Sequence, residues 1–203
     1  EVGVAEGGVL SFKNVPILAV PVISFPLSDK RKSGLLPPTV GLGDLNGFEV
    51  TQPYYWNIAP NRDATFYPTV MTKRGVELGG QFRYLEPSYQ GQMRLDYMPS
   101  DRLRDRNRWG FSALHNGTVD TGIEAIGNLG VGINLNRVSD DNYWRDFGRA
   151  SEPLRQRLLP NDAMLSWGSG DFSAQVRTLK WQTLQDATSP IVAPYDRMPQ
   201  LSW

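Results

Sequence analysis

Residues 129–136 read Leu-Gly-Val-Gly-Ile-Asn-Leu-Asn, so an apolar side chain alternates with a glycine or an asparagine along the whole stretch. Successive side chains of a β-strand point to opposite faces, which gives this strand one apolar face and one small, polar face. In a soluble sandwich the apolar face would lie on a core. In an outer-membrane barrel it would face lipid, and the polar face would line the lumen.

Similar alternation predicts antiparallel hairpins along most of the chain, with strands over 47–59, 64–73, 76–85, 92–97 and 108–115, one ending at 136, and two over 162–167 and 172–178. Short turns near 60, 88, 117 and 169 fall on one side of the predicted sheet, and Asn116-Gly117 is a strong turn signal. Longer loops at 101–107, 139–161 and 184–198 fall on the other side, which also has one tight turn at Arg74-Gly75. Short turns on one side and long loops on the other are typical of outer-membrane barrels.

The composition excludes several classes of protein. The chain has 203 residues, and its 21 Lys and Arg balance its 21 Asp and Glu, so there is no basic field to bind nucleic acid. The absence of cysteine excludes disulfides, thiol nucleophiles and thiolate metal sites within this sequence. No apolar run approaches the roughly 20 residues of a membrane-spanning helix. A barrel strand, in contrast, needs an apolar residue only at every second position.

The second face of the predicted strands is strongly polar. It carries charged and amide side chains, namely Glu77, Gln81, Arg83, Arg94, Asp96, Gln175 and Arg177. Unpaired charge in a small, dry core costs several kcal/mol, so these residues favour a wide, hydrated interior. Aromatic residues near strand ends, such as Trp109 and Trp167, match interfacial girdles. Both ends of the chain read as internal cuts, which indicates a piece of a larger barrel.

The first 34 residues differ from the rest of the chain. The apolar stretch 9–26 contains Pro16, Pro21 and Pro26. Proline has no N–H and breaks helices, so this composition fits edge strands of a separate β-domain. The basic run Lys30-Arg31-Lys32 follows. We therefore expect two parts, over residues 1–34 and 35–203.

The residues do not predict catalysis or metal binding. His115 is the sole histidine of the sequence, and Ser112 falls on the opposite face of the same strand, so no base is paired with a nucleophile. The pair Asp140-Asp141 lacks the spacing of a calcium loop, and we interpret it as solvated. We expect no catalytic residue, no metal and no cofactor.

Several segments carry a resemblance to a known family. Residues 53–65 read Pro-Tyr-Tyr-Trp-Asn-Ile-Ala-Pro-Asn-Arg-Asp-Ala-Thr. This segment closely resembles the start of the barrel in the LptD (OstA/Imp) family of outer-membrane lipopolysaccharide (LPS) assembly proteins. Residues 15–34 resemble that family's junction between a periplasmic β-jellyroll and the barrel. Shorter matches lie at 74–75, 82–85, 95–101, 138–140 and 199–201, whereas the family's disulfide cysteines are missing.

The resemblance implies an all-β fold in which the end of a periplasmic β-jellyroll (1–34) is followed by antiparallel meander strands of a large outer-membrane β-barrel (35–203). It also implies insertion of LPS into the outer leaflet of a Gram-negative outer membrane, and no enzymatic activity. The implied partners are LPS, the LptE plug lipoprotein, the periplasmic LptA bridge through the jellyroll, and outer-membrane lipid.

The family's lateral gate carries prolines in its first two barrel strands, and the matching positions here are Pro37, Pro38 and Pro53. The physical reason is that proline removes a ladder hydrogen bond, which lowers the cost of parting two strands. The alternative is that these residues are ordinary edge-strand prolines without a role in gating.

Two groups near the junction are candidates for contact with LPS. Lys30, Arg31 and Lys32 could donate charge-assisted hydrogen bonds to lipid phosphates, or they could form a solvated turn. An apolar group could line a groove for acyl chains or belong to the core of the jellyroll, namely Ile17, Val20, Ile23 and Phe25.

Two further functions stay open as alternatives. A small outer-membrane barrel enzyme acting on lipid A would need a complete catalytic constellation at one strand end. A soluble β-sandwich binding module would stay folded without detergent. The polar second face and the unequal loops disfavour the sandwich for residues 35–203, whereas it stays open for residues 1–34.

Overall fold

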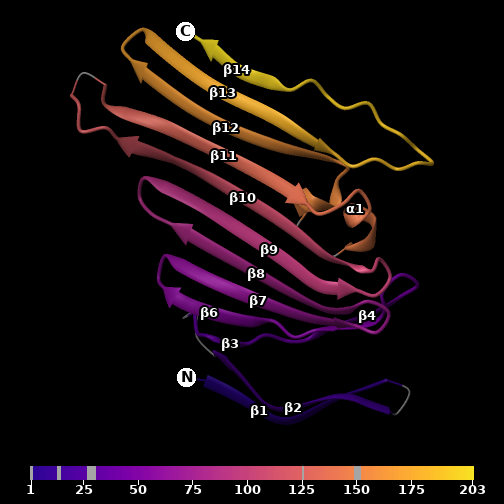
Figure 1. The fold of residues 1–203 in the computed structure, drawn as a ribbon. Coiled ribbons are helices and arrows are strands. Elements are labelled where there is room, and N and C mark those ends of the chain that lie inside the picture. The colour runs from indigo at the N-terminus through magenta and orange to yellow at the C-terminus, as the bar shows by residue number, and fades with distance from the viewer. Residues whose placement is uncertain (1, 13–14, 27–30, 125, 149–151) are drawn as a thin grey trace.

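The computed structural model describes residues 2–12, 15–26, 31–124, 126–148 and 152–203. Within these ranges the chain is almost entirely antiparallel β-structure, arranged as a two-stranded sheet and a 12-stranded sheet (Figure 1). The predicted all-β fold class is therefore confirmed. None of the described helices is long and apolar enough to cross a membrane.

The two-stranded sheet is a hairpin of β1 (Val2–Phe12) and β2 (Val15–Pro26). Its ladder begins with Val2 opposite Pro26 and ends with Phe12 opposite Val15. The proline-rich stretch thus forms a strand, as its composition predicts, and β1 is its ladder partner. Figure 1 draws this hairpin below β3, next to one edge of the larger sheet.

The larger sheet is a meander in which strands that follow one another in sequence pair as neighbours. Its order is β14-β13-β12-β11-β10-β9-β8-β7 (Figure 1). Next, β5 and β6 lie one after the other along β7, with β4 paired to β5 and β3 paired to β6. The strand bounds are β3 Gly34–Leu35, β4 Thr39–Gly43, β5 Gly47–Thr51, β6 Tyr54–Ala59, β7 Arg62–Met71, β8 Gly75–Leu85, β9 Tyr89–Asp101, β10 Arg106–Asp120, β11 Asn128–Val138, β12 Leu158–Ser169, β13 Phe172–Thr183 and β14 Arg197–Ser202.

The two faces of this sheet differ as the alternation predicts. Large apolar side chains stand exposed on one face, among them Leu42, Phe66, Val70, Leu78, Leu95, Leu165 and Val176. The other face carries polar residues, many of them buried, including Glu49, Thr51, Asp63, Thr69, Asp96, Arg108 and Asn136. We call these the apolar face and the polar face. A soluble sandwich would bury its apolar face, so this arrangement argues against that alternative.

Several predicted strand bounds are wrong. The strand expected over 47–59 is interrupted at Gln52-Pro53 and forms β5 and β6. The turn expected at Asn116-Gly117 does not form, because β10 continues to Asp120 and Gly117 pairs with both Tyr89 and Val131. The chain turns instead near Gly122 and Gly127, which both have positive φ. Strands β12 and β13 also extend beyond the predicted 162–167 and 172–178.

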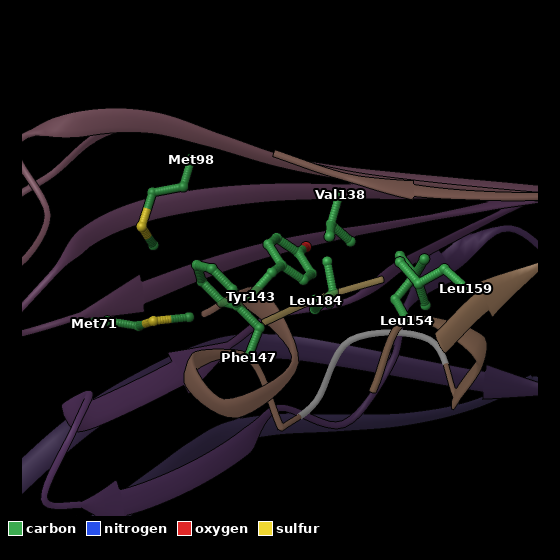
Figure 2. Packing of buried hydrophobic residues seen from close by; sticks show 8 residues of the cluster. All are labelled: Met71, Met98, Val138, Tyr143, Phe147, Leu154, Leu159 and Leu184. Atoms are coloured by element: carbon green, nitrogen blue, oxygen red, sulfur yellow. The ribbon is translucent and has the colours of Figure 1, made fainter. Parts of the chain in front are cut away.

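The loop between β11 and β12 folds back onto the polar face. It contains the helix α1 (Tyr143–Asp146) and the 3-10 turn η1 (Glu152–Arg155). Figure 2 shows the rings of Tyr143 and Phe147 within one cluster of buried apolar side chains. Apolar residues from the sheet and from its loop ends complete the cluster, namely Met71, Met98, Val138, Leu154, Leu159 and Leu184. The described part of this loop is therefore packed, whereas the sequence predicts a long polar loop.

Candidate functional site

The first edge of the larger sheet, which we define as β3 to β6, is built from two broken strands. Leu35 lies opposite Tyr54 and Thr39 lies opposite Thr51. Between these pairs the outer strand has three residues, 36–38, whereas its neighbour has two, 52–53. This mismatch is a β-bulge with one extra residue, a feature that bends a strand and interrupts its ladder.

The structure brings the three predicted gate prolines together at this bulge. Pro37 and Pro38 supply two of its three outer residues, and Pro53 lies opposite them and is buried. Across the bulge the backbone N–H of Leu36 donates to the Pro53 carbonyl oxygen at 2.9 Å. Since a proline can accept but not donate through its backbone, the ladder at this point is reduced on both strands.

A pocket of about 220 Å³ with a mixed polar and apolar lining adjoins the bulge on the polar face, and Thr39 and Pro53 line part of it, as do Met71 and Phe147. Deeper in the pocket the hydroxyls of Thr51 and Thr69 lie 2.8 Å apart in a hydrogen bond. The remaining polar lining comes from Asn46, Glu49, Tyr67, Glu77, Arg94 and Asp96. At the first edge, the charged polar face and the exposed apolar face thus lie on opposite sides of the same strands.

Within the pocket Arg94 is held in two ways. Its guanidinium donates to both Asp96 carboxylate oxygens at 2.9 Å and lies 4.7 Å from the centre of the Tyr67 ring. Across the described residues, His, Asp and Glu side chains nowhere gather in a group that could hold a metal ion.

The junction between the two sheets is fixed to the short-turn end of the polar face. Arg31 forms an ion pair with Asp63 at 3.3 Å, and the same carboxylate accepts two hydrogen bonds from Arg83 at 2.7 and 2.8 Å. The backbone N–H of Asn57 donates to the Ser33 hydroxyl at 2.8 Å. Both arginine side chains are more than half exposed, whereas Asp63 is buried, so their outer N–H groups face solvent.

The other predicted LPS contacts are described less fully. Lys32 is exposed and follows Arg31, whereas Lys30 lies outside the described residues. The four apolar candidates all lie in β2, where the backbones of Val20, Ile23 and Phe25 pair with β1. Their side chains are not among those described, so the acyl groove stays a prediction.

Sequence reasoning missed a second charged site, at the long-loop end of the polar face. We call it the loop cluster, and it consists of Arg74, Asp101, Arg108, Asp140 and Asp146. Arg108 is fully buried and reaches three carboxylates, with closest distances of 2.7 Å to Asp140, 2.7 Å to Asp146 and 3.1 Å to Asp101. Arg74 adds ion pairs to Asp101 and Asp146. The interpretation of Asp140 as solvated is therefore wrong.

The two loop carboxylates of this cluster are held ionised. Burial alone would raise the pKa of Asp140, but hydrogen bonds from Arg108 and Ser139 outweigh burial and lower the pKa below its usual value. Burial likewise opposes ionisation of Asp146, and Arg108 and Arg74 again bring the pKa below the usual range. Tyr143 and Phe147 are four residues apart, a spacing that places two side chains on the same side of a helical turn. This spacing is the feature of the sequence that indicates packing of the loop.

Comparison with known proteins gives matches along the whole chain. The family model described as "LptD protein" matches residues 4–135, and the one described as "LPS transport system D" matches residues 106–203. The chain is 65% identical to the LPS-assembly protein LptD of Polaromonas sp. over 202 residues, which are 100% of this chain and 25% of that protein. It is 45% identical over 202 residues to the protein of the same name from Cupriavidus necator, covering 100% of this chain and 24% of the relative.

The chain spans about a quarter of the length of the relatives that it matches. Their names describe assembly of LPS. The resemblance first noted at residues 53–65 is confirmed over the full sequence, and the chain belongs to the LptD family.

Proposed function

We propose that this chain contributes the end of a periplasmic β-jellyroll and the first wall strands of an outer-membrane β-barrel that exports LPS. The hairpin of β1 and β2 corresponds to the jellyroll end, within residues 1–34. The meander from β3 to β14 corresponds to the barrel wall, within residues 35–203. The location is the outer membrane of a Gram-negative bacterium, with the hairpin on the periplasmic side.

The observation that carries this proposal is the contrast between the two faces of one continuous sheet. Strands β7 to β13 have 10 to 15 residues each, and a transmembrane strand needs about 9 to 11. An exposed apolar face is stable against lipid, and a charged opposite face is stable against a water-filled lumen. The same sheet in plain water would expose far more apolar surface than a monomeric protein tolerates.

The first edge is proposed to act as one side of a lateral gate. In this role Pro37, Pro38 and Pro53 reduce the number of ladder hydrogen bonds that must break when the edge strand moves. The pocket beside them opens to the lumen, so sugars on the polar face and acyl chains on the apolar face would meet at this edge. LPS has both sugars and acyl chains, so its passage would need a polar and an apolar surface at the same place.

The junction is proposed to guide the phosphate groups of LPS. Arg31, which Lys30 and Lys32 flank in the sequence, lies at the short-turn end, and Arg83 adds a second exposed guanidinium. Guanidinium groups bind phosphate oxygens through paired hydrogen bonds. The apolar residues of β2, including Ile17, Val20, Ile23 and Phe25, are the corresponding candidates for acyl chains.

The proposed partners follow from family membership. They are LPS as cargo, the LptE lipoprotein as a plug of the lumen, the LptA bridge at the jellyroll, and outer-membrane lipid around the apolar face.

The test uses the full-length parent protein with Pro38→Ala and Pro53→Ala combined. A restored backbone N–H adds about 1 kcal/mol to the closed edge, or about fivefold in an opening equilibrium, where its acceptor has no other donor. We expect slower arrival of newly made LPS at the cell surface and higher permeability of the outer membrane to large antibiotics. Pro87→Ala, in a turn away from this edge, is the control. Unchanged LPS arrival in the double variant would overturn the proposal.

A further inference from the structure

At Leu36 and Pro53 a side chain takes the place of a backbone hydrogen-bond donor. In an antiparallel ladder, two residues that form a hydrogen-bonded pair exchange both N–H···O bonds. Leu36 donates its N–H to the Pro53 carbonyl oxygen at 2.9 Å, but Pro53 has no N–H to return to Leu36. The carbonyl of Leu36 therefore lacks the donor that any other residue at position 53 would supply.

The side chain of Gln52 supplies that donor. Its Nε2 atom donates to the Leu36 carbonyl oxygen at 2.7 Å and lies 3.4 Å from the Pro53 carbonyl oxygen. The backbone N–H of Gln52 donates in the opposite direction, to the carbonyl oxygen of Pro68 in β7, at 3.1 Å. Gln52 thus connects the outermost strand to the third strand of the sheet.

The position of Gln52 in its strand supports a specific role for the amide. Side chains at even positions from 48 to 58 point to the apolar face, and the others in this row are Phe48, Val50, Tyr54, Trp56 and Ile58. An amide among such residues is costly unless its polar atoms are hydrogen-bonded. The bond to Leu36 offsets that cost at the one place where the ladder lacks a backbone donor.

We propose that Gln52 is a positioning residue of the first edge, whose side-chain amide replaces the ladder hydrogen bond that Pro53 removes. A side-chain bond can break by rotation of the side chain, without displacement of the β5–β6 backbone. Gln52 therefore sets how firmly the broken outer strand is held. Its importance for export rests on the gate function proposed above, whereas its bond to Leu36 does not.

A double-mutant cycle in the full-length parent protein tests this inference. The measurement is hydrogen–deuterium exchange, read by mass spectrometry on peptides covering 34–43, for the protein in detergent micelles. The variants are Gln52→Ala, Pro53→Ala and the two combined. Gln52→Glu keeps the size but removes both donors, and Gln92→Ala, within β9 and away from the first edge, is the control.

With Pro53 present, Gln52→Ala is expected to speed exchange of these peptides about fivefold, the effect of one net hydrogen bond. Gln52→Glu should speed it at least as much, because a carboxylate cannot donate to a carbonyl. With Pro53→Ala present, the N–H of residue 53 can return to Leu36, so removal of the Gln52 side chain should have little effect.

Equal acceleration in both backgrounds, or no acceleration in either, would overturn the inference. Arrival of LPS at the cell surface, measured for the same variants, separates this inference from the gate proposal. Faster exchange together with altered LPS arrival supports both. Faster exchange with unchanged LPS arrival supports the Gln52 bond and counts against the gate.

Discussion

The first edge and the loop cluster hold the polypeptide by opposite means. At the first edge the ladders are short, the strands are interrupted by prolines, and a side-chain amide replaces a backbone donor. At the loop cluster, buried ion pairs and an apolar core fix a loop against long, continuous strands. The difference indicates where the sheet can part at low cost and where it cannot.

The physical basis of this contrast is what each region would expose on opening. Parting the first edge exposes a few backbone groups that water or lipid headgroups can solvate in part. Releasing the loop would separate the buried Arg108 from Asp140 and Asp146, and a broken buried ion pair costs far more than an exposed one. Motion is therefore expected at the first edge, while the loop and the strands beneath it move as one unit.

The largest expected effect comes from removing Arg108. In Arg108→Leu three carboxylates lose a buried partner, so we expect the free energy of unfolding to fall by about 3–5 kcal/mol. Thermal unfolding of the full-length parent protein in detergent measures the loss, and limited proteolysis should show new cleavage within the β11–β12 loop.

The control for this prediction is Arg106→Leu. Arg106 is 48% exposed and reaches Asp140 at 3.5 Å, so its loss should cost less than about 1 kcal/mol. If both variants have the same small effect, the loop cluster is not what fixes the loop, and the contrast with the first edge fails.

A smaller effect is expected from Gly110→Ala, which tests the packing beneath the loop. A Cβ at this position would lie 2.6 Å from the Tyr143 hydroxyl and 2.9 Å from a Leu154 methyl group. Overpacking of this kind costs about 1–3 kcal/mol. In the control Gly132→Ala the nearest atom would be 3.5 Å away, in Met164, so thermal unfolding should change little. Equal midpoints for the two variants would mean that the loop can shift freely.

The sequence predicted the sheet better than it predicted the two sites. Alternation at 129–136 and in the neighbouring strands identifies which side chains lie on the apolar face, because a strand cannot change this order without a bulge. The Asn-Gly turn signal at 116–117 misled because Gly117 serves another purpose. A Cβ there would lie 2.4 Å from the Cβ of Tyr89, so this glycine allows close approach of two strands.

The candidate sites depended on contacts between distant residues. The prolines of the first edge were identified from the family resemblance, but their meeting at one bulge required the register of four strands, β3 to β6. The role of Gln52 could not be predicted, because the acceptor of its amide lies 16 residues away. The loop cluster joins residues 74 to 146, and acidic residues in a polar loop usually remain solvated. Pairing of these charges is a tertiary property that no local pattern encodes.

The smallest effect is expected from Tyr143→Phe, and it separates packing from hydrogen bonding at the loop cluster. The Tyr143 hydroxyl is buried and has no hydrogen-bond partner among the described residues, and burial raises the pKa of Tyr143 well above its ordinary value. Its ring lies 4.6 Å from that of Phe147 and keeps this contact in the variant. Removing an unsatisfied hydroxyl should leave stability unchanged or raise it by up to about 1 kcal/mol.

Tyr55→Phe is the matched comparison, because the Tyr55 hydroxyl donates to Asp63 at 3.3 Å. Its removal should lower stability by up to about 1 kcal/mol, as expected for one hydrogen bond. Opposite signs for the two variants in thermal unfolding would mean that the loop is fixed by its rings and by Arg108. A loss for Tyr143→Phe equal to that for Tyr55→Phe would mean that the hydroxyl has a partner beyond the described residues. The loop would then depend on a polar contact, as the first edge depends on Gln52.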